Sequence, residues 1–260
     1  MPGAALCGVG VLVTRPAEQA GGLCRLIEEA GGTAIPCPLL EIVPTAHVPE
    51  ARKKFTVLEG TDWLVFVSAN AVRYAQTFWD DGIMRISARP RIAAIGRATA
   101  RALDEAGLCA DAVAPPPFDS EAVLTLDEFR EVAGQRILLV RGEGGREVLA
   151  DTLRARGAQV ESAEVYRRVA AEVDAQAVLA RWRRTPLLAA AVTSREILER
   201  FVTVFSPLMG AALQETPLAV IGDRVRQAAH QAGFGRVVAA AEAADAALLQ
   251  ALVRCMNRSS

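Results

Sequence analysis

The sequence matches itself at a constant offset of 126 residues. Self-similarity at a fixed period is the signature of repeated structural units. A period this long that occurs only twice indicates two copies of one small domain rather than a solenoid. The matching pairs, each 126 positions apart, are Arg15 and Arg141, Gly31 and Gly157, Ser68 and Ser194, Gly96 and Gly222, and Gly107 and Gly233.

Each copy alternates short apolar runs with helical patterns. The runs are continuously apolar, which is typical of parallel strands that are buried on both faces. The expected strands are Gly10–Thr14, Trp63–Val67, Ile92–Ile95, Ile137–Val140, Leu188–Val192 and Leu218–Ile221. The expected helices are Pro16–Ala30, Ala69–Trp79, Arg97–Glu105, Gly145–Arg156, Arg195–Val204 and Asp223–Ala232. This alternation predicts doubly wound parallel sheets with right-handed crossovers.

Two divisions of the chain into domains fit this pattern. The repeat alone suggests tandem domains that meet near the polar stretch Glu131–Gln135. In the second division, the extended segments Pro38–Pro44 and Glu164–Ala170 occupy equivalent repeat positions and both cross between lobes. The middle of the chain then forms one lobe, and its two ends form the other. The pattern of residues alone does not choose between the two.

Composition and charge argue against several functions. A formal net charge of −1 does not suit a general nucleic-acid binder. No apolar run approaches the roughly 20 residues that a membrane span needs, and no secretory pattern opens the sequence. We therefore expect a cytoplasmic protein with no membrane contact. Five scattered cysteines and two histidines lack metal-ligand spacing, so we expect no metal.

Polar residues follow six of the expected strands at their carboxyl ends, where open parallel sheets bind ligands. Each junction exposes backbone N–H groups at a helix N-terminus, which attracts anions by roughly 0.3–1 kcal/mol. Helix capping alone would explain any single junction. Six that face one cleft would suit a ligand with many carboxylates or phosphates. The candidate residues are Thr14 and Arg15; Ser68, Ala69 and Asn70; Gly96, Arg97 and Thr99; Arg141, Gly142 and Arg146; Thr193 and Ser194; and Gly222.

The sequence offers no nucleotide or triad motif, but it contains two phenols. It has no GxGxxG, GxxxxGK[ST] or GxSxG pattern. Tyr74 falls within an expected helix and is expected to pack. Tyr166 lies in a crossing segment beside the expected cleft. A free phenol has a pKa of about 10 and could donate a proton to a leaving group, although aromatic residues in strands usually serve packing.

The chain resembles uroporphyrinogen-III synthase in a series of short motifs that keep their order along nearly the whole sequence. They are Val13–Pro16, Phe66–Val72, Ala94–Ala100, Arg141–Arg146, Val165–Arg167, Thr193–Ser194 and Ile221–Gly222. The resemblance implies two similar doubly wound parallel-sheet (flavodoxin-like) domains joined by a two-stranded connector. Domain 1 would comprise residues 1–38 and 171–260, domain 2 residues 45–163, and the connectors residues 39–44 and 164–170.

The resemblance also implies a reaction: hydroxymethylbilane is closed to uroporphyrinogen III with inversion of ring D and loss of water. This needs no metal or organic cofactor. The substrate would carry eight carboxylates, which the candidate junction residues would bind. Tyr166 would be the catalytic residue, assisting departure of the terminal hydroxyl. Asp223, directly after Gly222, departs from this pattern because its carboxylate would repel an anion.

The sequence leaves two other classes of function open. One is a non-catalytic, two-lobed binder of a small polyanion; the missing secretory pattern counts against a periplasmic receptor of that kind. The other is an oxidoreductase with a degenerate dinucleotide loop; the missing fingerprint counts against it. We expect a monomer that acts on a small-molecule substrate. A transient contact with hydroxymethylbilane synthase is compatible with the resemblance, and the residues do not test it.

Overall fold

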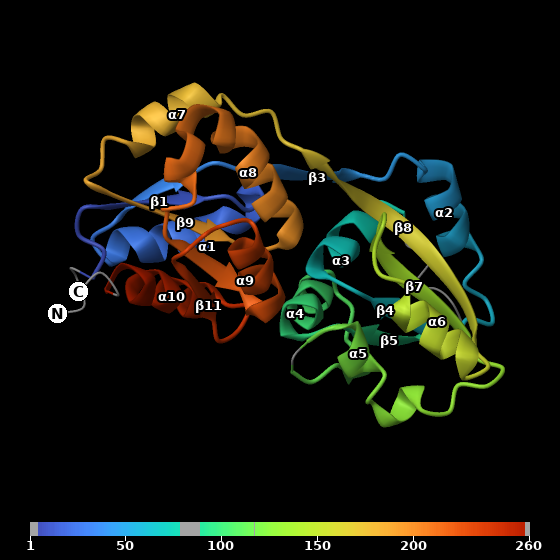
Figure 1. Cartoon of the computed structure of the whole chain (residues 1–260). Coiled ribbons are helices and arrows are strands. Elements are labelled where there is room, and N and C mark those ends of the chain that lie inside the picture. The colour runs from blue at the N-terminus through green and yellow to red at the C-terminus, as the bar shows by residue number, and fades with distance from the viewer. Residues whose placement is uncertain (1–4, 79–88, 117, 258–260) are drawn as a thin grey trace. The chain divides into compact units, whose positions relative to one another are not determined.

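The computed structural model describes residues 5–78, 89–116 and 118–257, and the chain divides into two compact units. Unit 1 comprises Met1–Glu41 and Val169–Ser260, and unit 2 comprises Ile42–Arg168. Each unit contains one β-sheet with helices on both faces (Figure 1). The predicted α/β class, with two similar doubly wound sheets, is confirmed. No helix of the described residues is long and apolar enough to cross a bilayer.

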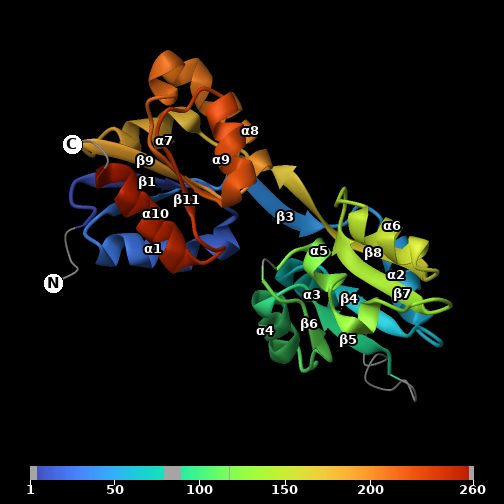
Figure 2. The ribbon, with the colours of Figure 1, turned by 60° about the horizontal axis from the view of Figure 1, so that its bottom comes forward.

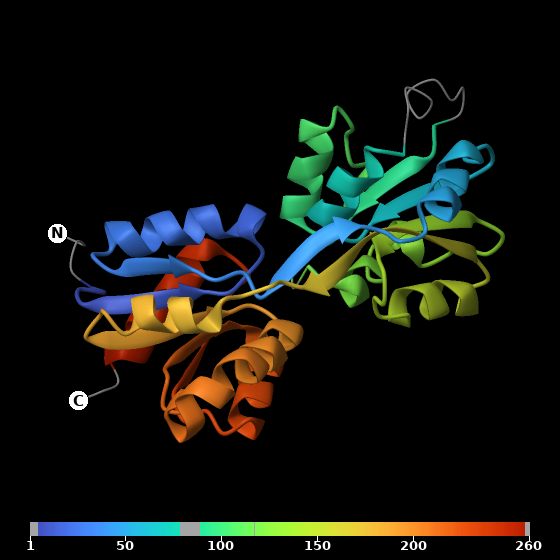
Figure 3. The same cartoon turned by 90° about the horizontal axis from the view of Figure 1, so that it is seen from above.

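Unit 1 is built on a five-stranded parallel sheet in the order β11-β10-β9-β1-β2. Its strands are β1 (Val9–Val13), β2 (Thr33–Pro36), β9 (Leu187–Val192), β10 (Leu218–Ile221) and β11 (Val237–Ala240). Its helices are α1 (Ala17–Glu29), α7 (Ala175–Trp182), α8 (Arg195–Met209), η3 (Gly210–Leu213), α9 (Gly222–Gln231) and α10 (Asp245–Asn257). Figure 3 shows α1, in blue, on the opposite side of this sheet from α7 and α8, in yellow and orange.

Two apolar layers hold unit 1 together, one on each face of its sheet. Leu23 and Leu248, from α1 and α10, belong to one layer. Trp182 and Phe201, from α7 and α8, belong to the other. The indole of Trp182 also donates a 2.8 Å hydrogen bond to the carbonyl of Gly10 in β1. Strands with buried residues on both faces explain why they are continuously apolar in the sequence.

Unit 2 is built on a six-stranded mixed sheet in the order β3-β8-β7-β4-β5-β6, and Figure 2 labels all six strands. They are β3 (Leu40–Pro44), β4 (Trp63–Phe66), β5 (Arg91–Ala94), β6 (Ala112–Val113), β7 (Arg136–Gly142) and β8 (Gln159–Ala170). Its helices are α2 (Val48–Thr56), α3 (Ala69–Ala75), α4 (Arg97–Glu105), α5 (Ser120–Val123), η2 (Asp127–Phe129) and α6 (Val148–Ala155). Residues of α2, α3 and α4 share one apolar layer, and residues of α5 and α6 share the other.

The 126-residue sequence repeat corresponds to a repeat of the strands in the two units. When 126 is added to the bounds of β2, the result is 159–162, the first residues of β8. In the same way β1 matches β7, and β4, β5 and β6 match β9, β10 and β11. Unit 2 therefore has the strand order β8-β7-β4-β5-β6 where unit 1 has β2-β1-β9-β10-β11. Unit 1 has the 2-1-3-4-5 order of flavodoxin-like sheets, and unit 2 has a circular permutation of it, because its equivalents of the first two strands, β7 and β8, come last in the chain.

The two extended segments between the units belong to β3 and β8, which are neighbours at the edge of the unit 2 sheet. Ala171 N donates to Leu39 O at 3.1 Å, and Thr45 N donates to Val165 O at 3.2 Å. From the first pair to the second, the residue number rises along β3 and falls by the same amount along β8, so the two segments run antiparallel. The boundaries between the units fall inside these strands, after Glu41 and after Arg168.

Several element boundaries differ from those expected. The helix expected from Gly145 begins at Val148, because Gly145 belongs to the loop after β7, where its carbonyl accepts a hydrogen bond from Arg141. The helix from Arg195 continues to Met209. The helix from Ala69 ends at Ala75, and its expected end at Trp79 lies outside the described residues. Among the described residues, the elements that were not expected are β2, β6, β11, α2, α5, α7, α10 and the short helices η2 and η3.

Candidate active site

The candidate site is a pocket of about 280 Å³ in unit 2, at the carboxyl ends of β4 and β7. The chain leaves these neighbouring strands toward opposite edges of the sheet, so their following helices, α3 and α6, pack on opposite faces. A crevice at such a switch point is where doubly wound sheets bind ligands. The pocket is lined by Val67, Ser68, Ser120, Leu139, Arg141, Gly142, Gly145, Arg146, Leu149, Tyr166 and Arg168.

Ser68 lies where β4 ends and α3 begins. Its backbone is extended, with φ −164° and ψ 161°, and its hydroxyl accepts a 3.0 Å hydrogen bond from Ala71 N. This is the ordinary geometry of a serine N-cap. The same hydroxyl lies 3.2 Å from the phenol oxygen of Tyr166. The cap therefore fixes the position of an oxygen that also reaches the pocket.

Tyr166 is buried in β8, with 5 % of its surface exposed. The register between β7 and β8 shifts at Arg141 and Gly142, so that Gly142 pairs with Tyr166. Beyond this bulge, Glu143 N donates a 2.8 Å hydrogen bond to Tyr166 O. A bulge of this kind re-aims a side chain, and here the phenol reaches the pocket from the neighbouring strand.

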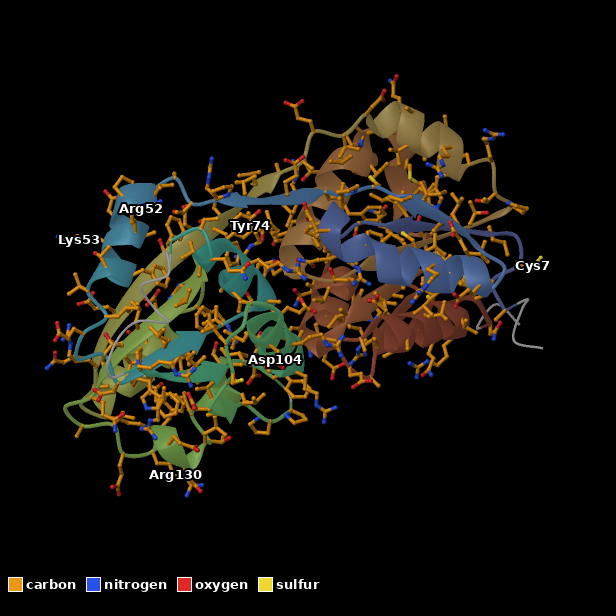
Figure 4. All side chains as sticks on the ribbon, turned by 180° about the vertical axis from the view of Figure 1, so that it is seen from behind. Cys7, Arg52, Lys53, Tyr74, Asp104 and Arg130 are labelled. Atoms are coloured by element: carbon orange, nitrogen blue, oxygen red, sulfur yellow. The ribbon has the colours of Figure 1, made fainter. Side chains whose placement is uncertain are left out.

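Tyr74, the other phenol, extends from α3 and is labelled in Figure 4. Its hydroxyl donates a 2.5 Å hydrogen bond to the carbonyl of Ile42 in β3. Its ring centroid lies 5.8 Å from that of Tyr166. Tyr74 thus ties α3 to the edge strand and packs against the pocket phenol, without lining the pocket itself.

The arginines of the pocket differ in their surroundings. Arg141 is buried, and its guanidinium donates to Gly145 O and lies 2.8 Å from a carboxylate oxygen of Glu147. It therefore holds the loop between β7 and α6 in shape. Arg146 is more exposed and forms two hydrogen bonds, of 2.7 and 3.1 Å, with the carboxylate of Glu121.

The junction after β5 is also in unit 2, but it does not line the pocket. Gly96 has a φ of 88°, a left-handed conformation that favours glycine. The buried hydroxyl of Thr99 donates to Ile95 O at 3.0 Å. The guanidinium of Arg97 lies over the ring of Phe118, 5.8 Å from its centroid. Ala69 and Asn70, in the first turn of α3, are partly exposed and likewise lie outside the pocket lining.

The predicted site residues of unit 1 follow β1, β9 and β10. Thr14 is fully buried, and its hydroxyl donates to Ala191 O at 2.6 Å. Arg15 pairs with Asp245 at 2.7 Å. Ser194, which follows Thr193, caps α8 by accepting a 3.2 Å hydrogen bond from Ile197 N. Gly222 has a φ of 76° and opens α9, with the adjacent Asp223 paired to Arg226.

Arg168, Ser120 and Leu149 also line the pocket, although the sequence motifs did not point to them. Arg168 could have been found, because residues two apart in a strand share a face, and Tyr166 lies two positions before it. Ser120 could not, because it opens a helix of four residues that has no periodic signal.

A carboxylate beside the pocket has a perturbed pKa. Glu143 accepts hydrogen bonds from Thr45 Oγ1 at 2.6 Å and from Ala46 N at 3.0 Å. The Thr45 hydroxyl is the main cause that lowers the pKa of Glu143 below its ordinary value of 4.5, with further contributions from Ala46 N and the nearby His47 and Arg167. Glu143 therefore stays ionised at neutral pH and cannot be a proton donor there.

A larger pocket, of about 400 Å³, lies at the amino ends of β7 and β8. It is lined by Lys53, Lys54 and Arg136 among others, and the ammonium of Lys54 pairs with Glu161. None of the predicted site residues lines it. Doubly wound sheets bind ligands at the opposite, carboxyl ends, so the smaller pocket is the better candidate. Within the described part of the chain, no three histidine, cysteine or acidic side chains gather as a metal site.

The fold and the pocket define a two-unit doubly wound α/β protein with arginines and a phenol at the switch point of its unit 2 sheet. The sequence model of the family described as "Uroporphyrinogen-III synthase HemD" matches residues 22–250 of this chain. The chain is 32 % identical to the uroporphyrinogen-III synthase of Escherichia coli K12 over 245 residues, covering 94 % of this chain and all of the relative. It is 30 % identical to that of Synechococcus elongatus, covering 84 % of each chain.

Solved structures support the same fold. The uroporphyrinogen-III synthetase of Helicobacter pylori superposes with a TM-score of 0.63 at 14 % identity, covering 94 % of this chain and 98 % of that one. A mutant Thermus thermophilus uroporphyrinogen III synthase superposes with a TM-score of 0.61 at 20 % identity, covering 96 % and 100 %. The chain belongs to the uroporphyrinogen-III synthase family and is a lyase of tetrapyrrole biosynthesis.

Proposed function

We propose that Tyr166 is the proton donor when this enzyme closes hydroxymethylbilane to uroporphyrinogen III. The observation that carries the proposal is the position of the phenol: it lines the pocket at the switch point and lies 3.2 Å from the Ser68 hydroxyl. The nearby Glu143 is ionised at neutral pH and cannot supply the proton. A neutral phenol can.

The proton balance of the proposed step is as follows. The O–H bond of Tyr166 breaks, and its proton joins the terminal hydroxyl of the bilane. The C–O bond breaks with its electron pair on oxygen, so water leaves together with a cationic azafulvene and a phenolate. Ring D then attacks through its substituted carbon to give the spiro intermediate. The original C–C bond between ring D and its neighbouring methylene carbon then breaks, and the unsubstituted α-carbon of ring D attacks the azafulvene so formed. Because the overall reaction loses only water, the phenolate takes back the proton that this α-carbon releases when the pyrrole ring regains its aromaticity.

The arginines of the pocket suit a substrate rich in carboxylates. Arginine matches a carboxylate in bidentate fashion. Arg146 and Arg168 are exposed at the pocket, so we expect them to bind substrate carboxylates, with Arg146 exchanging Glu121 for the substrate. Arg141 is bonded within its own loop, and we expect it to act by holding Gly142 and Gly145 in place.

The remaining predicted contacts stay predictions. In unit 2 these are the backbone N–H groups of Ala69, Asn70 and Arg97; Gly96 N already donates to Ala94 O, so Gly96, with the buried Thr99, supports the junction. In unit 1 they are Arg15, Thr193, Ser194 and Gly222, which we expect to bind carboxylates of the bilane; the predicted contact of Thr14 does not fit its full burial, and its hydroxyl supports the junction by donating to Ala191 O. Such contacts would orient the two reacting ends, which is catalysis by positioning.

The test of the proton donor compares two variants that each remove one hydroxyl. Freshly made hydroxymethylbilane is given to each purified enzyme, the products are oxidised, and the type I and type III isomers are separated. Tyr166→Phe should slow turnover at least about tenfold, which is about 1.4 kcal/mol of barrier. Tyr74→Phe, which loses the hydroxyl's bond to Ile42 O and lies outside the pocket lining, should stay near the wild-type rate. Equal rates for the two variants would reduce Tyr166 to a packing residue.

We further expect the enzyme to be a cytoplasmic monomer that needs no cofactor. A transient contact with hydroxymethylbilane synthase would shorten the exposure of an unstable substrate to water. Sedimentation of the purified enzyme, alone and mixed with that synthase, tests both expectations. A stable dimer of this chain, or no shift on mixing, would count against them.

A further inference from the structure

We propose that Ser68 is a positioning residue for the reaction: its hydroxyl donates a hydrogen bond to the oxygen of Tyr166 and leaves the proton of Tyr166 free to reach the substrate. This inference rests on the proposed role of Tyr166. It assigns to Ser68 a function beyond capping a helix or touching a carboxylate.

The first step is the inventory of hydrogen bonds at Ser68. A serine hydroxyl has one proton to donate and two lone pairs that accept. One lone pair is already used, because Ala71 N donates to Ser68 Oγ at 3.0 Å. The proton of the hydroxyl and its second lone pair both remain for Tyr166 Oη, 3.2 Å away, so this contact allows donation by either group, and the chemistry of the step decides between them. Within residues 5–78, 89–116 and 118–257, Ser68 is the one hydrogen-bonding partner that Oη has.

The second step is the charge that develops at the phenol. In the opposite orientation, Tyr166 would donate to Ser68, and its proton would have to leave that bond before it could reach the bilane. When Ser68 donates, the same bond is kept throughout and strengthens as Oη becomes negative, since hydrogen bonds to charged groups are roughly twice as strong as neutral ones. An interaction that is stronger in the transition state than in the ground state accelerates the step.

The third step is the comparison with the duplicate site in unit 1. Ser194 is the repeat partner of Ser68 and caps α8 in the same way, through Ile197 N. The position that corresponds to Tyr166, 126 residues earlier, is the buried Leu40. Both serines are thus explained as caps, but only Ser68 has a phenol beside its hydroxyl.

The test is a double-mutant cycle on the full enzyme. Ser68→Ala should lower kcat about tenfold, with a smaller change in KM, and Ser68→Thr, which keeps the hydroxyl, should restore most of the rate. In the Tyr166→Phe background, Ser68→Ala should change kcat less than about twofold, because Ser68 acts through the phenol. Asp174→Ala removes the comparable cap of α7, from Asp174 to Ala177 N, and should leave kcat unchanged.

A second measurement reads the hydrogen bond directly. The chain has two tyrosines, so labelling with [¹³Cζ]-tyrosine gives two resonances, which Tyr74→Phe assigns. Ser68→Ala should move the Tyr166 resonance and leave that of Tyr74 in place. Because Ser68→Thr restores the cap as well as the hydroxyl, the double-mutant cycle with Tyr166→Phe is what separates loss of the contact with Tyr166 from loss of the cap.

The outcomes separate this inference from the proposed function. If Tyr166→Phe turns over at the wild-type rate, the proposed role of Tyr166 fails and this inference fails with it. If Tyr166→Phe is slow but the effects of the two substitutions multiply, or the Tyr166 resonance does not move, only the role of Ser68 fails. Multiplying effects with a raised KM would show that Ser68 binds substrate directly.

Discussion

Gly142 lies so close to Tyr166 that a Cβ atom at position 142 would be 2.5 Å from Cζ of the phenol and 3.0 Å from its oxygen. The two residues are paired where the register of β7 and β8 shifts. The absence of a side chain at Gly142 therefore provides the space that the ring of Tyr166 fills.

The first prediction follows from this contact. Gly142→Ala should force the ring away from Ser68, destabilise the protein by about 1–3 kcal/mol through overpacking, and slow formation of the type III isomer at least about tenfold. Turnover and the denaturation midpoint measure the two effects. Gly235→Ala is the control, because its Cβ would meet nothing within 4 Å. Wild-type turnover in Gly142→Ala would mean that the exact position of the ring is unimportant.

The second prediction concerns two aspartates in the first turns of unit 1 helices. Asp245 pairs at 2.7 Å with Arg15, whose side chain is 12 % exposed. Asp223 pairs at 2.9 Å with Arg226, whose side chain is 41 % exposed. Asp245→Ala should cost about 1.5–3 kcal/mol, because it leaves a desolvated guanidinium without its acceptor. Asp223→Ala should cost less than about 1 kcal/mol. Urea denaturation checks this, and equal losses would contradict it.

The third prediction concerns acid. The pKa of Glu143 is lowered in the folded protein, chiefly by Thr45, so the unfolded state binds more protons as the pH falls. Its contribution to stability is therefore present above the ordinary value of 4.5 and is lost as the pH falls through the folded pKa. Glu143→Gln should flatten this acid dependence in urea titrations, whereas Glu128→Gln, at an exposed site, should keep it. An unchanged curve for Glu143→Gln would disprove the link.

The fourth prediction concerns thiol reactivity. Burial raises the pKa of Cys37 to about 12, so almost none of it is thiolate at neutral pH. Cys7 and Cys109 are exposed. Iodoacetamide should label these two at least about a hundredfold faster than Cys37, as measured by peptide mass spectrometry, and urea should remove the difference. Rapid labelling of Cys37 in the native protein would show that this part of unit 1 opens readily.

Much of the fold could be predicted because its central strands are buried on both faces. Leu218–Ile221 was predicted to the residue, since no polar residue interrupts it. β6 could not be predicted, because two residues carry no periodic pattern. β8 was predicted only in part: its burial pattern is irregular, with two consecutive buried residues followed by two exposed ones, and its length depends on pairing with β7 and with β3, which is far away in the sequence.

The candidate site was predictable where local geometry determines it. The caps at Ser68 and Ser194 follow from the strand–turn–helix sequence. The environment of Arg141 does not, because the sequence cannot show that Glu147 and Gly145 O occupy its guanidinium. The contact of Ser68 with Tyr166 joins residues 98 positions apart and depends on the shift in register between β7 and β8. No sequence pattern predicts this shift.

The interrupted order of unit 1 has a consequence for biosynthesis on the ribosome. β1 and β2 emerge first, but β1 must pair with β9, which begins at Leu187. Translation of the roughly 150 intervening residues takes on the order of 8–30 s at about 5–20 residues per second. During that delay unit 2 can fold, while β1, whose only available partner is β2, lacks β9 on its other side. The nascent N-terminus is therefore the segment of this enzyme that most needs a chaperone.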